Sequence, residues 1–556
     1  MKPTIYLPSF AAGLALSAAA ASAGAQEHQH PPSQPATTEA EAVVPIYDNL
    51  GTLHHAITMK SPVAQKYFDQ GLRLTYGFNH EEAIKSFKEG VKHDSTCAMC
   101  YWGIAYALGP NINLPMDTAA ARPAYGAAQK ALKYSSSTTP KERAYIEALA
   151  RRYSPDPSAN RAPLDSAWAI AIGEVSRRFP ADDDAAALHG EALMDLRPWN
   201  YWTNGGRPKA PSTLEAVRVL EPVVKRNLNH PGACHYYIHA IEASNEAGKA
   251  LACAERLGSL MPGAGHLVHM PTHIYIRLGK WDIAADRNVH AVHADEQYIS
   301  ERQPTGVYPM AYYPHNYHMM WYALNMLGRS EDALKAAQGV VKNVPADVVR
   351  QAPPLEYFSP TVLFTLARFS RWDEALREPA PPKDLRYTTG VWHYVRGLAY
   401  AAQDKLDSAT VERDKLVAIA KASPADAYAN LNSVQSLLAI AENHLQGEMA
   451  AKRGRTDEAV KHLEKAIAGE DELTYDEPPP WYLPIRQRLG GVLLEAGRPA
   501  EAEKAFRADL VRRPENGWSL HGLAKSLKAQ GKTKQAAAVE ARFKKAWSKA
   551  DVKVGE

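Results

Sequence analysis

The chain has 556 residues, of which 46% are hydrophobic and 22% charged, an ordinary globular composition that excludes disorder throughout. The 64 Lys and Arg residues nearly balance the 61 Asp and Glu residues, so the net charge of +3 gives no strong attraction to nucleic acid or a membrane. Length alone predicts about four domains or one long repeat array.

The amino-terminal segment has the pattern of an export signal. Lys2 precedes an apolar run over residues 10–21 and a small-residue cleavage pattern at residues 23–25. The run is shorter than the ~20 residues that span a bilayer, so we predict a signal peptide over residues 1–25, no membrane span and a periplasmic mature protein. Residues 26–45 contain four prolines and lack large apolar residues, which predicts a disordered leader.

Helical patterns dominate the chain beyond residue 46 and recur with a period of 34 residues. The clearest unit, residues 483–516, places Gly490, Ala502 and Phe506 at positions where paired helices meet. Small residues there let two antiparallel helices approach closely, and such units bury their apolar faces only by stacking. The same shift connects other alanines, namely Ala216, Ala250 and Ala284, then Ala375 and Ala409, and finally Ala502 and Ala536.

This register resembles the tetratricopeptide repeat (TPR) family over most of residues 64–550, with a weaker match over residues 100–215. The resemblance implies an all-α, right-handed TPR-type α-solenoid built from pairs of an A helix and a B helix. The opening block, LHHAITMKSPVAQKYFDQGLRLTYGFNHEEAIKSF followed by CAMCYWGIAYALGPNIN, is similar to a bacterial family of exported TPR proteins, which implies a fold and a compartment but no activity. We divide the array into amino-terminal, His-rich central and carboxyl-terminal repeats over residues 46–215, 216–345 and 346–556.

Five Pro-rich insertions interrupt the period. Proline ends helices, and four of the insertions also contain Trp or Tyr. Loops of this kind are consistent with a lid or rim over the groove of the solenoid and equally with packing that extends its core. The insertions cover residues 110–116, 197–211, 305–317, 352–360 and 476–484.

Cys97 and Cys100 form the motif CAMC at the start of a helix. A c-type haem site requires His where Tyr101 stands, a zinc ribbon requires a second CxxC, and a thioredoxin-like pair requires a βαβ setting. We therefore predict a local disulfide. Cys234 and Cys253 share one repeat, and the sequence leaves open whether they form a second bridge or two buried thiols.

Ten of the 21 histidines lie between His230 and His318, and most of them follow the repeat register. The TPR resemblance implies that positions 2, 5 and 9 of each A helix line the concave groove. Histidines occupy those positions in three successive A helices. They are His235, His239, His266, His269, His273, His315 and His318.

Neutral imidazole is a common ligand of transition metals, and two His at i,i+4 lie on one helix face. We therefore predict a periplasmic metalloprotein that binds Cu, Zn or Fe, with two i,i+4 pairs at its core. If the metal activates water or oxygen, the protein is a metal-dependent hydrolase or oxidoreductase, with Glu242, Glu191 and Asp195 as acid/base candidates. The segment HLVHMPTHIYIRLGKW is not a zinc-protease motif, because Met270 stands where HExxH requires Glu.

A TPR interaction scaffold without metal or catalysis is the alternative function. In either case we expect a small-molecule or peptide ligand in the concave groove. The sequence contains no GxGxxG, P-loop, GxSxG or basic-aromatic stripe, which argues against nucleotide binding, a hydrolase triad and nucleic-acid binding. The sequence does not indicate the oligomeric state.

Overall fold

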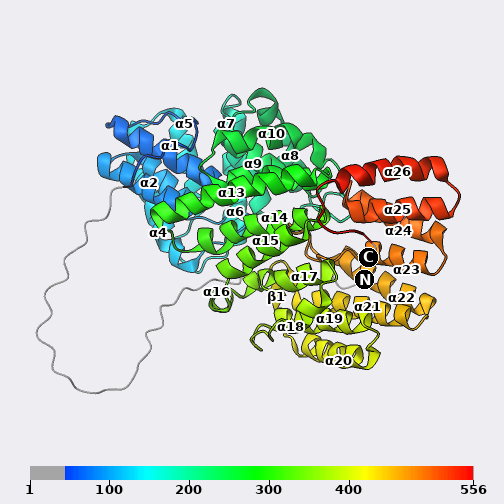
Figure 1. Cartoon of the computed structure of the whole chain (residues 1–556). Coiled ribbons are helices and arrows are strands. Elements are labelled where there is room, and N and C mark those ends of the chain that lie inside the picture. The colour runs from blue at the N-terminus through cyan, green and yellow to red at the C-terminus, as the bar shows by residue number, and fades with distance from the viewer. Residues whose placement is uncertain (1–43, 555–556) are drawn as a thin grey trace, which may run out of the picture. The chain divides into compact units, whose positions relative to one another are not determined.

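The computed structural model describes residues 44–554 (Figure 1). By their internal contacts these residues form two compact units. Unit 1 contains residues 44–48 and 53–179, and unit 2 contains residues 49–52 and 180–554. The predicted signal peptide and all but the last two residues of the predicted leader lie outside the described residues.

Unit 1 is helical. Its elements are α1 (Pro62–Tyr76), α2 (His80–His93), α3 (Ala98–Ala107), α4 (Thr118–Tyr134), η1 (Ser135–Ser137), α5 (Pro140–Ala150) and α6 (Arg161–Arg178).

Unit 2 continues with helical pairs and one very short hairpin. Its elements up to residue 351 are α7 (Asp183–Asp195), α8 (Pro211–Arg226), α9 (Pro231–Ile241), η2 (Ala247–Ala250), α10 (Leu251–Leu260), α11 (Gly265–His269), α12 (Pro271–Arg277), α13 (Trp281–Arg302), η3 (Tyr308–Tyr312), α14 (Tyr313–Met326), α15 (Ser330–Asn343) and α16 (Ala346–Gln351). The remaining elements are η4 (Pro353–Phe358), α17 (Thr361–Arg368), α18 (Trp372–Arg377), α19 (Arg386–Ala402), α20 (Leu406–Ala422), β1 (Tyr428–Ala429), β2 (Asn432–Ser433), α21 (Val434–Lys452), α22 (Thr456–Glu472), α23 (Ile485–Glu495), α24 (Pro499–Arg512), α25 (Gly517–Ala529) and α26 (Thr533–Ala546).

The predicted all-α solenoid is confirmed. Consecutive helices pack in pairs, from α1 with α2 to α25 with α26. Among the described residues, the named strands form only the antiparallel hairpin in which Tyr428 pairs with Ser433 and Ala429 with Asn432. None of the described helices has the length and apolar character of a bilayer span.

The small residues of the register have the predicted packing role. The Phe506 ring on α24 fits between Gly490 on α23 and Gly522 on α25, where an added Cβ would lie 2.5 Å and 2.2 Å from the ring. Phe87 on α2 lies in the same way against Gly71 and Gly103, at 2.6 Å and 2.5 Å. One B-helix phenylalanine thus fills the notch between two successive A helices at both ends of the array.

Local sequence determines how the histidine-bearing helices begin. His230 caps α9, because its Nδ1 accepts a hydrogen bond from the backbone N–H of Ala233 at 3.0 Å, and Pro231 occupies the first helical position. Gly265 begins α11 where an added Cβ would lie 1.9 Å from Asp295 Oδ1 on α13. Pro271 lacks an N–H and interrupts the helix between α11 and α12.

The last repeats of unit 2 contact helices in the middle of the same unit. Trp281 Nε1 on α13 donates to the carbonyl of Pro514 at 2.8 Å, and the buried Arg513 donates from Nε to the Tyr322 hydroxyl at 3.1 Å. Asp551 accepts a hydrogen bond from the backbone N–H of Ser330 at 2.7 Å. These contacts join the last repeats to α13, α14 and α15, so unit 2 closes on itself.

The predicted disulfide between Cys97 and Cys100 is confirmed. Cys234 and Cys253 are buried free thiols, which answers the question that the sequence left open.

The notch between A helices can be tested with Gly522→Ala. The added methyl group meets the Phe506 ring, so we expect the free energy of unfolding to fall by about 1–3 kcal/mol, measured by denaturant titration followed by circular dichroism. Gly126→Ala is the control, because a Cβ at this glycine of α4 meets nothing within 4 Å. Equal stability of the Gly522→Ala variant and the wild type would contradict the packing role.

Candidate metal centre

Six of the seven predicted groove histidines converge on one buried cluster in unit 2. Helices α9, α11, α12 and α14 carry them, which are the A helices of three successive pairs. Their ligand nitrogens form two sets, each with all its atoms within 4.8 Å of one another. The first triad is His235, His239 and His266, and the second triad is His269, His273 and His315.

Within each triad, two Nε2 atoms lie very close together. His235 Nε2 is 3.2 Å from His266 Nε2, and His269 Nε2 is 2.8 Å from His273 Nε2. Imidazole nitrogens bound tetrahedrally at about 2.0–2.1 Å from one ion lie about 3.3–3.4 Å apart. The ring positions therefore approach the spacing of ligands on a shared ion.

Asn288 on α13 fixes the protonated nitrogen of His269. Its Nδ2 donates to Thr272 Oγ1 at 3.0 Å and to the carbonyl of Ala284 at 2.8 Å. These two acceptors orient the amide so that Oδ1, 2.7 Å from His269 Nδ1, is the acceptor there. His269 Nδ1 consequently carries the proton, and in the neutral ring Nε2 has the lone pair.

Two buried carboxylates do the same for His239 and His273. Glu242 Oε1 is 3.0 Å from His239 Nδ1, and Glu242 Oε2 is 2.6 Å from His273 Nδ1. Glu477 Oε2 approaches the same His273 Nδ1 at 2.7 Å. The exposed fraction is 1% for Glu242 and 4% for Glu477, so neither carboxylate is stabilised by bulk water.

The consequence is a site that requires positive charge. With Nδ1 protonated in both rings, the facing Nε2 atoms of His269 and His273 would oppose two lone pairs at 2.8 Å. Burial lowers the pKa of His273, but the Glu242 and Glu477 carboxylates outweigh burial and raise it to about 10. Burial and neighbouring imidazoles hold the pKa values of His239, His266, His269 and His315 well below the ordinary value. These four rings are therefore neutral and available as ligands.

Four of the predicted insertions, all in unit 2, contact the seven predicted groove histidines, which we call the histidine wall. Trp199 stands edge-on to His239 with ring centroids 5.2 Å apart, and Tyr312 stands edge-on to His266 at 4.9 Å. The 476–484 insertion supplies Glu477. The insertions also add core contacts, since Trp202 Nε1 donates to the carbonyl of Ala240 at 2.8 Å. The interpretation that the insertions extend the core is therefore confirmed in unit 2, and the lid over a groove stays a prediction.

His318, the seventh predicted ligand, does not join either triad. Its ring stacks on Trp321 with centroids 5.1 Å apart and meets Phe358 and Tyr482 edge-on. Neither ring nitrogen has a hydrogen-bond partner among the described residues, and burial lowers the pKa of His318 to about 3. His318 is thus a neutral ring in an aromatic box, one helical turn from His315.

The three predicted acid/base residues separate into two places. Glu242 lies between the triads, as described above. Glu191 and Asp195 on α7 lie outside both triads, and together with Glu242 they face Tyr201. Burial and the charges of these three carboxylates raise the pKa of Tyr201 well above its ordinary value.

Two residues of the site were missed by sequence reasoning. Glu477 carried a partial signal, because it belongs to an insertion that was singled out for its aromatic and proline content. Nothing in the sequence singled out Asn288, because an asparagine on a B helix has no pattern that indicates a binding site. Its role becomes visible only when α13 packs against α11.

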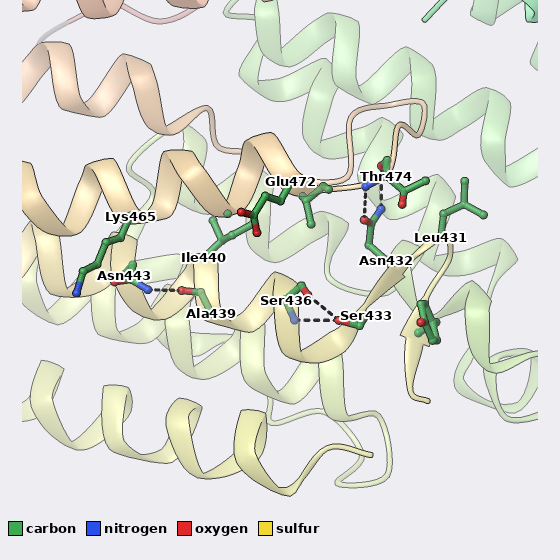
Figure 2. Close-up of a pocket in the computed structure, with 13 residues that line it drawn as sticks. Leu431, Asn432, Ser433, Ser436, Ala439, Ile440, Asn443, Lys465, Glu472 and Thr474 are labelled. Carbon is green, nitrogen blue, oxygen red and sulfur yellow. Dashed lines mark hydrogen bonds between the residues drawn. The ribbon is translucent and has the colours of Figure 1, made fainter. Parts of the chain in front are cut away.

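The loop that carries Glu477 is held in place by the β1–β2 hairpin. Asn432 Nδ2 donates to the carbonyl of Thr474 at 3.1 Å, and Asn432 Oδ1 accepts from the backbone N–H of Thr474 at 2.8 Å (Figure 2). Asn430 Nδ2 donates to Asp476 Oδ2 at 2.7 Å. Thr474 and Asn432 also line an open pocket of about 440 Å³ along α21 and α22, shown in Figure 2. The pocket wall thus continues into the loop that reaches the histidine cluster.

No protein-family model and no curated protein matches this chain. Among solved structures, human IFIT1 with m7Gppp-AAAA is 14% identical, with 88% of this chain and 91% of that chain covered and a TM-score of 0.32. Yeast Tom70 is 11% identical, with 85% and 96% covered and a TM-score of 0.32. Naa15/Naa10 bound to HypK-THB is 13% identical, with 86% and 70% covered and a TM-score of 0.22. Likenesses this distant carry no argument about the ligand of this chain.

The orienting role of Asn288 can be tested with Asn288→Leu. We expect the wild type to show His269 as the Nδ1-protonated tautomer and the variant to lose that preference, because the acceptor Oδ1 is gone. Nitrogen NMR of protein labelled at histidine measures the tautomer. Asn443→Leu is a matched control, because Asn443 Oδ1 faces His462 Nδ1 at 3.4 Å between α21 and α22, with the same separation of 19 residues. A wild-type His269 protonated on Nε2 would contradict the assignment.

Proposed function

We propose that this protein is a metalloprotein that binds a transition metal, Cu, Zn or Fe, through the Nε2 atoms of the triads. The observation that carries the proposal is the facing pair His269 Nε2 and His273 Nε2, 2.8 Å apart, with both Nδ1 atoms committed to acceptors. Imidazole is a ligand that suits all three metals.

The outer contacts favour a metal over a merely hydrogen-bonded histidine cluster. Metal-binding His residues typically donate their second ring N–H to a carboxylate or carbonyl, which fixes the tautomer and raises ligand basicity. His239 and His269 have this arrangement, with Glu242 and Asn288 as acceptors, and His273 Nδ1 lies within ion-pair distance of Glu242 and Glu477. In the metal-free protein a proton on His273 Nε2 supplies the positive charge that the site requires, because Glu242 and Glu477 raise the pKa of His273 to about 10, and a metal ion would displace that proton.

The chemistry that suits the site is activation of a small ligand. A set of three His ligands leaves a coordination position open, as in catalytic zinc sites, and a metal ion there supplies activation of water or oxygen. Glu242 orients His239 and His273 through both its oxygens, so Glu191 and Asp195 beside Tyr201 remain the acid/base candidates. We propose a metal-dependent hydrolase or oxidoreductase that acts on a small molecule.

A peptide-binding scaffold is the rival function of the helical-repeat fold. In unit 2 the wall that would contact an extended ligand is covered by the protein's own Trp199, Tyr312 and Glu477. His315 alone among the six cluster histidines is partly exposed, and the other five are buried. Partial exposure at one residue admits a small ligand more readily than a peptide.

We further propose that the mature protein is exported to the periplasm. The support is the signal pattern of residues 1–25 together with the Cys97–Cys100 disulfide, since disulfides persist in oxidising compartments.

The metal proposal is tested by titrating metal-free protein with Zn²⁺ against a chromophoric chelator near neutral pH. We expect the wild type to bind Zn²⁺ tightly. In His239→Ala and His273→Ala we expect the affinity for Zn²⁺ to fall by more than the ~10–100-fold that is typical when a residue that only hydrogen-bonds to a ligand is lost. His462→Ala and His521→Ala, in α22 and α25, are controls that should bind like the wild type. A wild type that takes up neither Zn²⁺ nor Cu²⁺ nor Fe²⁺ would refute the proposal and favour the scaffold.

Glu477→Gln tests the outer partner separately. The amide retains the shape of Glu477 but removes the charge beside His273 Nδ1, so we expect the affinity for Zn²⁺ to fall by about 10–100-fold while binding persists. Glu472→Gln is the control, because Glu472 is exposed at the end of α22, five residues earlier. Unchanged affinity in Glu477→Gln would exclude Glu477 from the site.

A further inference from the structure

We infer that the cluster is a two-ion centre, with one transition metal ion held by each triad. The inference rests on the proposed metal function and deepens it. Its starting point is the number of converging rings, since six histidines exceed what one tetrahedral ion takes.

Distances argue against one ion shared by all six rings. Two ligands bound at about 2.1 Å can be no more than about 4.2 Å apart, even on opposite sides of an ion. Within a limit of 4.8 Å, two groups of three imidazole nitrogens account for all six rings, and a further group of His239, Glu242 and His273 connects them. The rings of different triads are still neighbours, with His239 and His273 centroids 5.3 Å apart and His266 and His269 centroids 5.7 Å apart. Two ring pairs inside a triad are farther apart than this, with centroids 6.3 Å apart for His239 and His266 and 5.9 Å apart for His273 and His315. The two sets therefore adjoin, and the repeat register, not ring spacing, divides them.

The repeat register produces the same three-ligand set twice. The first triad combines positions 5 and 9 of α9, His235 and His239, with position 2 of the next A helix, His266. The second triad combines the same positions one repeat later, His269 and His273, with position 2 of α14, which is His315. Equivalent positions in equivalent helices therefore generate equivalent sites.

The register also explains why residues 44–554 contain no third triad made of histidines alone. At positions 5 and 9 of α14 stand His318 and Tyr322, so the i,i+4 partner of His318 is not an imidazole. Tyr322 instead accepts a hydrogen bond from Arg513. His318 accordingly belongs to the aromatic box and not to the metal centre.

Glu242 links the two sets. One oxygen faces Nδ1 of His239 in the first triad and the other faces Nδ1 of His273 in the second. A single buried carboxylate thus orients a ligand of each ion and offsets part of their combined charge. Because each triad supplies three ligands and the triads adjoin, the open positions would suit a small anion such as hydroxide or azide between the two ions.

The test is to load metal-free protein with Cu²⁺ and to measure bound copper by elemental analysis and its spin by electron paramagnetic resonance. We expect elemental analysis to find two Cu²⁺ per wild-type chain. We expect the integrated resonance signal to correspond to well below two unpaired spins per chain, because bridged Cu²⁺ ions couple magnetically. His235→Ala breaks the first triad and His315→Ala breaks the second. Each variant should retain one Cu²⁺ that gives the full signal of an isolated ion, and His462→Ala should behave like the wild type.

The outcomes separate this inference from the proposed function. A wild type that binds one Cu²⁺ refutes the two-ion centre but leaves the metalloprotein proposal intact, whereas a wild type that binds none refutes both. If helicity is normal and both variants lose all copper, the sites are not independent and the inference fails. Added imidazole provides a second check, because it should restore the second ion in His315→Ala, where the removed side chain is partly exposed.

Discussion

The contact on which the rest of the site depends is the pairing of the buried Glu242 carboxylate with His239 and His273. A carboxylate removed from water is costly unless it is compensated by charge or hydrogen bonds. Here its oxygens face one Nδ1 in each triad, and Glu477 adds a second buried acid at His273. Together with Asn288, which fixes His269, these carboxylates leave the Nε2 atoms of His269 and His273 facing each other. The result is a demand for positive charge that a proton or a metal ion can meet.

The repeat architecture explains how so many imidazoles converge. Stacked A helices present the same register positions at neighbouring points of one wall, so a His pair on one helix and a His on the next meet twice along the array. The insertions then enclose that wall with Trp199 and Tyr312. The closure of unit 2, through contacts such as Trp281 with Pro514, brings the carboxyl-terminal repeats that carry Glu477 into the same unit.

The sequence predicted those parts of the structure that depend on periodicity. The 34-residue spacing predicted the helical pairs and the Phe506 notch, and the same spacing placed six of seven histidines in one cluster. It did not distinguish His318, because the aromatic box around it comes from loops distant in the chain. It also missed Glu477 and Asn288, since their contacts require the return of the 476–484 segment and the packing of α13, which no local pattern encodes.

The most direct test of a histidine wall that holds metal is anomalous X-ray diffraction at the zinc absorption edge, from crystals grown with Zn²⁺. The account predicts an anomalous peak within about 2.0–2.1 Å of the Nε2 atoms of His269 and His273, with those two nitrogens moved apart from their 2.8 Å separation. Crystals that show zinc only at surface sites, with the two Nε2 atoms still in mutual contact, would contradict it.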